Sequence, residues 1–283
     1  MQDFKVDFYH ALETATSAAK EAASILNIYA QDHSKLSISY KSRNDLVSQA
    51  DKDAEQAILQ VVRERTPEIA IVAEESGTSA NLDESQYTWF IDPLDGTTNF
   101  LHGIPHYAVS IGLVARAGTV LIPNTPPLEV NTPILGVVYD PNRQEMFGAI
   151  YQDGCFLNGQ RIYTSQAKHL EDALLATGVP FRDFSFETPY MRGFKEVMHH
   201  TRGIRRLGSA ALDLAWVACG RFDGYWEMGL APYDVCAGTI LVREAGGTVS
   251  DIYEKEPWPQ SGNIIASTKS IEEDFGNLIR QQL

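Results

Sequence analysis

The chain has 283 residues, which allows one large domain or two packed domains with a substantial buried core. Asp and Glu (37) outnumber Lys and Arg (23), and the formal net charge of −14 argues against a protein that grips nucleic acid backbones through a basic face. With 44% hydrophobic and 21% charged residues, the composition is typical of a folded globular protein and excludes a disordered or fibrous one.

The N-terminal quarter of the chain predicts helices followed by strands. Apolar residues recur every three or four positions from Phe4 to Tyr29, which is the pattern of a long amphipathic helix. The further elements predicted here are an extended segment at 36–40, a helix at about 48–65 ended by Pro67, and buried strands at 69–75 and 87–92.

The middle of the chain predicts antiparallel strands. Three runs rich in β-branched and aromatic residues, 106–116, 134–140 and 145–151, are separated by turn signals. The stretch 119–134 contains four prolines, so we expect an exposed loop between the first two strands.

The second half of the chain alternates between strands and helices, which indicates a layered α/β protein. A boundary is predicted near residue 150, between an N-terminal α+β half (1–150) and a C-terminal α/β half (151–283) packed as one unit. Strands are predicted near 173–177, 222–227, 248 and 263–267, and helices near 186–200, near 210–218, after Tyr233 and at the end of the chain up to Leu283.

Cysteine usage and hydropathy indicate the compartment. Cys155, Cys219 and Cys236 are widely spaced and odd in number, so we expect them to be reduced, in the cytoplasm. The N-terminus lacks the pattern of a signal peptide, and no apolar run approaches the length of a membrane span.

The most informative segment is IDPLDGTTNF, residues 91–100. Pro93 restricts Asp92 to an extended backbone, and Asp95 can turn its carboxylate toward the same point. Two anions held that close need a cation between them. The segment therefore predicts a metal site.

The residues that follow the two aspartates suit a phosphate group. Gly96 permits close backbone approach to a ligand, and the amides of Thr97 and Thr98 would face an anion if a helix begins there. The same turn could therefore bind metal through its carboxylates and phosphate through its amides.

Other carboxylates could join this site. Glu74 and Glu75 follow directly on an apolar strand, and Asp234 stands at the start of an apolar run with helical period. Oxygen ligands of this kind suit Mg²⁺, whereas the lack of Cys and His in the set disfavours zinc.

Each signal also has a purely structural interpretation when it is taken alone. A D-P-x-D-G string is typical of a solvated turn, Asp234 is a favoured helix cap, and Glu74 with Glu75 suits a solvated strand end. The combination of the three favours the metal site.

The whole set of motifs resembles the inositol monophosphatase family of Mg²⁺-dependent phosphatases, over nearly the full length of the chain. The resemblance rests on DPLDGTTNF (92–100), the upstream Glu-Glu pair, and a helix-opening Asp followed by Ala-Gly and EAGG. KSRNDLVSQAD (41–51) resembles the family's lysine-to-aspartate segment, and 203–234 is similar to the family's bacterial branch. The resemblance implies an α/β (α+β) fold, a layered α-β-α-β-α sandwich.

The resemblance also implies a site for two to three Mg²⁺ ions. Glu74, Asp92 and the backbone carbonyl of Leu94 would hold the first ion. Asp92, Asp95 and Asp234 would hold the second, and Glu74 would help with a weaker third. Most of these ligands lie in the half 1–150, while 151–283 supplies Asp234 and substrate contacts.

By the same resemblance, Asp51 and Thr97 form a hydrogen-bonded pair that, with Glu74, orients or deprotonates the attacking water. The amides of Gly96 and Thr97 would receive the phosphate. The full substrate-binding set implied by the family is Asp95, Gly96, Thr97, Gly208, Ser209, Ala210, Glu227 and Asp234.

The sequence departs from the family pattern at two places. Tyr233 replaces the Trp that commonly precedes the last ligand, which keeps an aromatic wall and should leave Asp234 in place. The Pro-rich stretch 119–133 is longer than usual, and its role is open.

The function implied is hydrolysis of a small phosphate monoester, with inositol 1-phosphate as the first candidate. Glu227 offers a carboxylate to a polyol and no cation to a second phosphate, which favours monophosphates. Fructose 1,6-bisphosphate, 3′-phosphoadenosine 5′-phosphate and histidinol phosphate remain alternatives, as does a regulatory protein that binds a protein partner in transcription or RNA metabolism. Family members are often lithium-sensitive homodimers, and we expect no membrane association.

Several other residues have alternative interpretations. The basic residues Arg182, Arg205 and Arg206 could lie at the site entrance, at a subunit contact or on the solvated surface. The pair His199–His200 predicts a helix end or surface pair rather than a metal site, because adjacent residues do not share a helix face. Trp216 and Cys219 are predicted to lie in the core.

Overall fold

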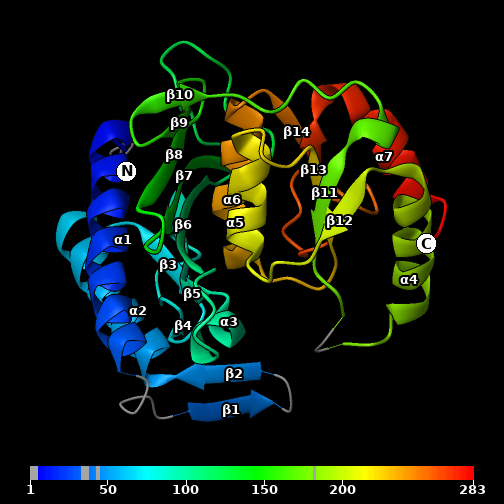
Figure 1. The fold of residues 1–283 in the computed structure, drawn as a ribbon. Coiled ribbons are helices and arrows are strands. Elements are labelled where there is room, and N and C mark those ends of the chain that lie inside the picture. The colour runs from blue at the N-terminus through cyan, green and yellow to red at the C-terminus, as the bar shows by residue number, and fades with distance from the viewer. Residues whose placement is uncertain (1–5, 33–37, 43–44, 181–182) are drawn as a thin grey trace.

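Helices and sheets alternate in five layers, as the sequence predicts (Figure 1). The structure is a computed structural model that describes residues 6–32, 38–42, 45–180 and 183–283. The first layer consists of α1 (Phe8–Gln31) and α2 (Gln49–Arg65), the central one of α5 (Ala210–Ala218) and α6 (Pro232–Glu244), and the outer one of α4 (Glu187–His200) and α7 (Glu272–Arg280). The α-β-α-β-α sandwich is therefore confirmed.

The first sheet has eight strands in the order β10-β9-β8-β7-β6-β5-β3-β4. Only β3 and β5 pair in parallel, and the strands from β5 to β10 run antiparallel, as the sequence predicts. The strands are β3 (Ala70–Ala73), β4 (Gly77–Thr78), β5 (Tyr87–Asp95), β6 (Ala108–Ala115), β7 (Thr132–Asp140), β8 (Glu145–Ile150), β9 (Gly154–Leu157) and β10 (Gln160–Ile162).

The second sheet has five strands in the order β12-β11-β13-β15-β14. Its strands are β11 (Leu174–Thr177), β12 (Gly203–Arg205), β13 (Gly224–Glu227), β14 (Gly247–Asp251) and β15 (Ile264–Thr268), with β11 parallel to β12 and β13. The remaining elements are the hairpin β1 (Ile38–Ser42) and β2 (Asp45–Ser48), the short helix α3 (Thr97–Leu101), and the 3₁₀ turns η2 (Leu170–Asp172) and η3 (Lys269–Ile271).

Capping residues explain where the first two helices begin. The Asp7 carboxylate accepts hydrogen bonds from the amides of Tyr9 and His10, so α1 begins at Phe8, later than the apolar pattern suggests. Ser48 caps α2 in a capping box with Asp51, as the sequence favours. Two parts of these predictions, Phe4 and 36–37, lie outside the described residues.

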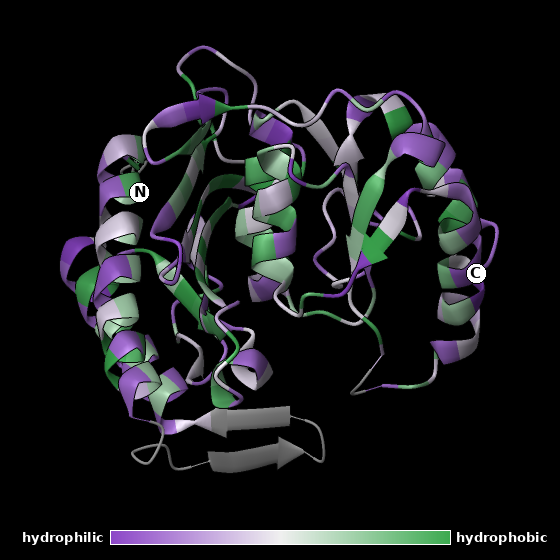
Figure 2. Cartoon of the chain, viewed as in Figure 1, coloured by the Kyte–Doolittle hydropathy of each residue, from purple (hydrophilic) through white to green (hydrophobic). Residues whose placement is uncertain are grey.

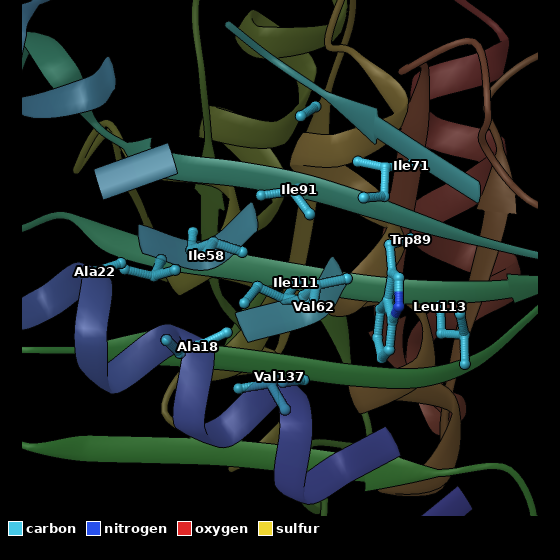
Figure 3. Close-up of a cluster of buried hydrophobic side chains, with 14 of the residues drawn as sticks. Ala18, Ala22, Ile58, Val62, Ile71, Trp89, Ile91, Ile111, Leu113 and Val137 are labelled. Atoms are coloured by element: carbon cyan, nitrogen blue, oxygen red, sulfur yellow. The ribbon is translucent and has the colours of Figure 1, made fainter. Parts of the chain in front are cut away.

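The first core lies between α1, α2 and the first sheet (Figure 3). Ala18 and Ala22 present small side chains to the sheet, which lets α1 lie close to the strands that carry Ile111 and Val137. Trp89 is fully buried there, and its indole N–H donates to Thr66 Oγ1 at 3.1 Å.

The central helices are apolar on nearly all sides, whereas α1 and α4 show polar residues on their outer faces (Figure 2). A Cβ on Gly112 would lie 2.9 Å from the Ala237 amide nitrogen, and one on Gly136 would lie 2.9 Å from Ala237 Cα. These two glycines therefore allow α6 to contact the first sheet closely.

The first sheet extends beyond the predicted boundary near residue 150. The division near residue 150 stays a prediction, and the first sheet itself continues to Ile162 through β9 and β10, which the sequence did not indicate. The Pro-rich segment forms a loop, yet its Leu121 is buried against the first core.

None of the helices in the described ranges is both long and apolar enough to cross a bilayer.

Candidate functional site

Two parallel strands bring the first acidic residues together. Strand β3 ends at Ala73, and the Glu74 amide donates to the Ile91 carbonyl of β5 at 3.1 Å. Because β3 and β5 run in parallel, Glu74, directly after β3, and Asp92, near the end of β5, lie at the same edge of the sheet. The pairing of β5 with β6 shifts register between Asp92 and Asp95, around Pro93, which has no amide hydrogen to donate.

Helix α6 enters at the same edge. Ser110 pairs with Asp92 across the sheet, and its hydroxyl donates to the Tyr233 carbonyl at 3.3 Å. Asp234 is therefore held in the first turn of α6, where its Oδ2 accepts the Ala231 amide at 2.7 Å. The N-cap of α6 is Ala231, so the interpretation of Asp234 as the cap residue is wrong; Asp234 is the third residue of the helix, and its side chain closes the first turn.

Asp92 lies in a buried and acidic environment. Asp92 is only 2% exposed, and its burial, followed by the charges of Glu74, Asp95 and Asp234, raises its pKa well above the usual range. Four acidic groups that repel one another in this way are the donor set that a hard cation such as Mg²⁺ prefers. The residues present therefore fit a magnesium site.

Hydrogen bonds orient the carboxylates of Asp92 and Asp95. Asp92 Oδ1 accepts the Leu94 amide at 2.9 Å, and Asp95 Oδ2 accepts the Ser209 hydroxyl at 2.6 Å and the Ala211 amide at 2.7 Å. Within the described part of the chain, no three His, Cys, Asp or Glu side chains form a group that could hold a metal ion as they now stand. A bound ion would therefore require the side chains to turn toward it.

Asp51 and Thr97 lie together although they are far apart in sequence. The Thr97 hydroxyl donates to Asp51 Oδ1 at 3.0 Å and lies 3.1 Å from the Leu94 carbonyl oxygen. Asp51 is 1% exposed, and burial raises its pKa in spite of hydrogen bonds from Ser48 and Thr97. The predicted pair is present, whereas its part in catalysis stays a prediction.

The turn after the aspartates is tightly packed. Gly96 has a φ of +101°, and a Cβ there would lie 3.1 Å from the His106 carbonyl oxygen and 3.3 Å from that of Gly208. Helix α3 begins directly after it, at Thr97, as the motif suggests. The buried Asn99 fixes the loop from the second half by donating to the Leu207 carbonyl at 2.8 Å.

The residues of the second half that match the family's substrate contacts gather near Asp95. Ser209 bonds directly to Asp95 and caps α5, which begins at Ala210, and Gly208 lies against Gly96. Glu227 ends β13 and is 8% exposed. The structure thus brings the predicted substrate-binding residues to the same region, and their contacts with substrate stay a prediction.

Sequence reasoning missed Glu55. Its side chain is 1% exposed, and its two carboxylate oxygens accept the amides of Glu75 and Ser76 at 2.7 and 2.8 Å. Glu55 therefore fixes the turn that follows Glu74. The available signal was its position four residues after Asp51, which places both acids on one face of α2.

Arg205 and Arg206 line a pocket of about 720 Å³, called the arginine pocket below. None of the proposed metal ligands is among its lining residues. Arg143 and Arg221 stack on Trp216, with guanidinium carbons 5.1 and 5.2 Å from its ring centroid. Trp216 packs against the second core, as predicted, and its ring is also partly exposed as a wall of this pocket. The pocket is lined by Asn99, Ile104, Pro105, His106, Arg143, Leu174, Arg205, Arg206, Leu207, Trp216, Arg221 and Phe222.

The predictions for the cysteines and for the histidine pair can also be compared with the structure. Cys155, Cys219 and Cys236 are free thiols, and Cys219 is partly buried against the second core. The pair His199–His200 ends α4 on the surface, as expected. Arg182 lies outside the described residues.

Comparison with known proteins shows the family of the chain. The model of the inositol monophosphatase family matches residues 9–283. Similar proteins include Nus factor SuhB of Pseudomonas aeruginosa (42% identical over 258 residues, 90% of both chains) and inositol-1-monophosphatase of Synechocystis (42% over 272 residues, 95% of this chain and 88% of that one). The crystal structure of extragenic suppressor protein suhB from Bartonella henselae superposes with a TM-score of 0.86 at 36% identity, covering 96% of this chain and 99% of that one. Because the family model spans nearly the whole chain, the protein belongs to the inositol monophosphatase family.

Proposed function

We propose that the protein is a Mg²⁺-dependent hydrolase of small phosphate monoesters, with inositol 1-phosphate as the favoured substrate. The observation that carries the proposal is that the parallel pairing of β3 with β5 and the hydrogen bond from Ser110 to Tyr233 bring Glu74, Asp92 and the start of α6 to one edge of the first sheet. Burial and then the charges of Glu74, Asp95 and Asp234 raise the pKa of Asp92 there. A buried anionic cluster of this kind costs free energy unless a cation neutralises it. Membership of the family and the similarity to an inositol-1-monophosphatase support the same reaction.

Two to three Mg²⁺ ions would be held by Glu74, Asp92, the Leu94 carbonyl, Asp95 and Asp234, the ligand set that the family resemblance implies. When bound, Mg²⁺ supplies a water of lowered pKa and offsets the negative charge on the phosphoryl and leaving oxygens.

The protein's own groups perform the remaining steps. Asp51 accepts the Thr97 hydroxyl and so orients the oxygen of Thr97 toward an attacking water. Glu74 or this pair takes the proton from that water, a contribution worth roughly 10²–10⁴-fold in rate. The Gly96 and Thr97 amides receive the phosphate, and Gly208, Ser209, Ala210 and Glu227 bind the hydroxyl groups of the leaving alcohol.

The test is phosphate release from a panel of esters, with and without Mg²⁺ and Li⁺. The panel contains inositol 1-phosphate, fructose 1,6-bisphosphate, 3′-phosphoadenosine 5′-phosphate and histidinol phosphate. We expect Mg²⁺-dependent release that is fastest with inositol 1-phosphate and is inhibited by Li⁺. No release from any ester at any Mg²⁺ concentration would overturn the proposed function.

The arginine pocket favours a second function, binding of an acidic protein partner in transcription or RNA metabolism. Four arginines line it, of which Arg143 and Arg221 are paired with the carboxylates of Asp140 and Glu145. Arg205 and Arg206 form no such ion pair within the described part of the chain, so these two supply the positive charge for an acidic partner. The name Nus factor SuhB of a similar protein supports this alternative.

Binding should therefore survive Asp234→Asn, which removes a proposed metal ligand, and should be lost in Arg205→Ala/Arg206→Ala. A pull-down with mass-spectrometric identification compares the two variants, and loss of binding in both would contradict a separate function. We also propose that the protein is a cytoplasmic homodimer, which light scattering of the purified chain tests.

A further inference from the structure

Strand β13 places two polar side chains on one face behind the candidate site. Tyr225 and Glu227 are two residues apart on the strand, so their side chains point to the same side. The Tyr225 hydroxyl donates to Glu227 Oε2 at 2.5 Å, and both residues are buried. A tyrosine hydroxyl thus holds the carboxylate that the proposed function assigns to the leaving alcohol.

Gly178 provides the space in which this carboxylate lies. A Cβ on Gly178 would collide with both carboxylate oxygens of Glu227. The backbone around this glycine is fixed, because the Tyr190 hydroxyl donates to the Gly178 carbonyl and the Thr177 hydroxyl donates to the Trp226 carbonyl at 2.6 Å. The carboxylate of Glu227 is therefore positioned from two sides.

The pair lies on the face of the second sheet that packs against α5 and α6. Burial raises the pKa of Tyr225 well above its usual range, and the charges of Glu227, Asp213 and Asp95 add to the effect. The phenol therefore stays protonated and remains a hydrogen-bond donor. Tyr225 packs in the same core as α5, and Ser209, which caps α5, donates to Asp95, so the pair lies on the side of the second sheet that faces Asp95.

We propose that Tyr225 is a positioning residue that fixes the Glu227 carboxylate in the space left by Gly178, so that the site selects phosphate monoesters with a neutral polyol leaving group. This inference rests on the proposed function. A fixed carboxylate accepts hydrogen bonds from the hydroxyl groups of a polyol, whereas it repels a second phosphate. Holding it in advance avoids the entropy cost of ordering it when the substrate binds.

The experiment compares Tyr225→Phe with the unchanged protein on two esters, inositol 1-phosphate and 4-nitrophenyl phosphate, at saturating Mg²⁺. The aryl ester has no hydroxyl groups for Glu227 to bind. We expect the ratio of kcat/KM for the inositol ester to that for the aryl ester to fall about tenfold, mainly through KM, because a hydrogen bond to a charged group is lost. In a Glu227→Gln background, adding Tyr225→Phe should change the ratio by less than about twofold.

Tyr87→Phe is the matched control. Tyr87 is also a buried tyrosine, but it lies at the start of β5 in the first core. Removal of the Tyr87 hydroxyl should lower the melting temperature without changing the ratio of the two kcat/KM values. An unchanged ratio in Tyr225→Phe, or an equal loss with both esters, would overturn the positioning role. If the unchanged protein hydrolysed neither of the two esters, the proposed function would be overturned, and this inference with it.

Discussion

The Thr97 hydroxyl donates to Asp51 Oδ1 at 3.0 Å across 46 positions of the chain. Asp51 lies in the first turn of α2, where it also accepts the Ser48 amide at 2.8 Å, and Thr97 is the first residue of α3. The start of α2 and the start of α3 are thereby tied together at the edge where β3 and β5 end. This contact joins the capping of a helix to the proposed activation of water.

Removal of the Thr97 hydroxyl should slow turnover without unfolding the protein. In Thr97→Val the water would lose an oriented oxygen, so we expect kcat to fall by roughly 10²–10⁴-fold with little change in KM. Steady-state kinetics with inositol 1-phosphate measure both constants. The control Thr98→Val alters the exposed neighbouring hydroxyl and should retain activity within about twofold. Unchanged kcat in Thr97→Val would exclude the pair from the reaction.

Asp234→Asn should abolish Mg²⁺-dependent phosphate release while leaving the fold intact. The amide oxygen of Asn can still accept the Ala231 amide, so the closure of the first turn is kept and the free energy of unfolding should change by only about 1 kcal/mol. Activity and thermal unfolding are measured on the same sample. Asp7→Asn changes the cap of α1 in the same way, away from the site, and should stay active. Near-normal turnover in Asp234→Asn would remove this residue from the ligand set.

Glu55→Gln should raise the Mg²⁺ concentration needed for half-maximal activity. One of the two oxygens that accept the amides of Glu75 and Ser76 becomes an NH₂ group, so the turn that positions Glu74 loses a partner. Supporting residues of metal ligands typically contribute about 10–100-fold in affinity. A Mg²⁺ titration of activity measures the shift, and Glu64→Gln on the exposed end of α2 is the control. An unchanged Mg²⁺ requirement would mean that Glu55 has only a structural part.

Asp213 should make stability depend on pH. Burial, and then the charges of Glu227 and Asp95, raise the pKa of this carboxyl well above its usual range in the folded protein. Its contribution to stability is therefore complete below the unfolded-state pKa of about 3.9 and is lost as pH rises through the folded-state value. Asp213→Asn keeps a neutral side chain at every pH.

We therefore expect the melting temperature of Asp213→Asn, relative to the unchanged protein, to rise between pH 4.5 and pH 8. Differential scanning fluorimetry at a series of pH values measures this difference. Asp274→Asn, on the exposed first turn of α7, should show none. A difference that stays constant with pH would show that Asp213 does not titrate with folding.

Local signals explain why much of the fold could be predicted. The predicted bounds of the helix 210–218 agree with those of α5. The predicted bounds of α2 agree within one residue, because Ser48 and Pro67 mark the ends of this helix. Strands β9 and β10 escaped prediction because they are short and partly exposed, so they carry little hydrophobic pattern.

The candidate site could be predicted only in part, for a different reason. Asp92, Asp95 and Thr97 belong to one motif, so their proximity is visible in the sequence. The hydrogen bond between Asp95 and Ser209 joins positions 114 residues apart, and no spacing rule indicates it. The pocket at Trp216 was missed likewise, because its arginines come from loops and strands that only the tertiary structure brings together.

The most direct test of the account is phosphate release from inositol 1-phosphate as Mg²⁺ is titrated, with the unchanged protein and Asp92→Asn measured in parallel. The account predicts release that rises from zero with Mg²⁺ in the unchanged protein and no release in Asp92→Asn, because Asp92 is the ligand that the first and second proposed ions share. Release without a divalent cation, or equal release by both proteins, would contradict it.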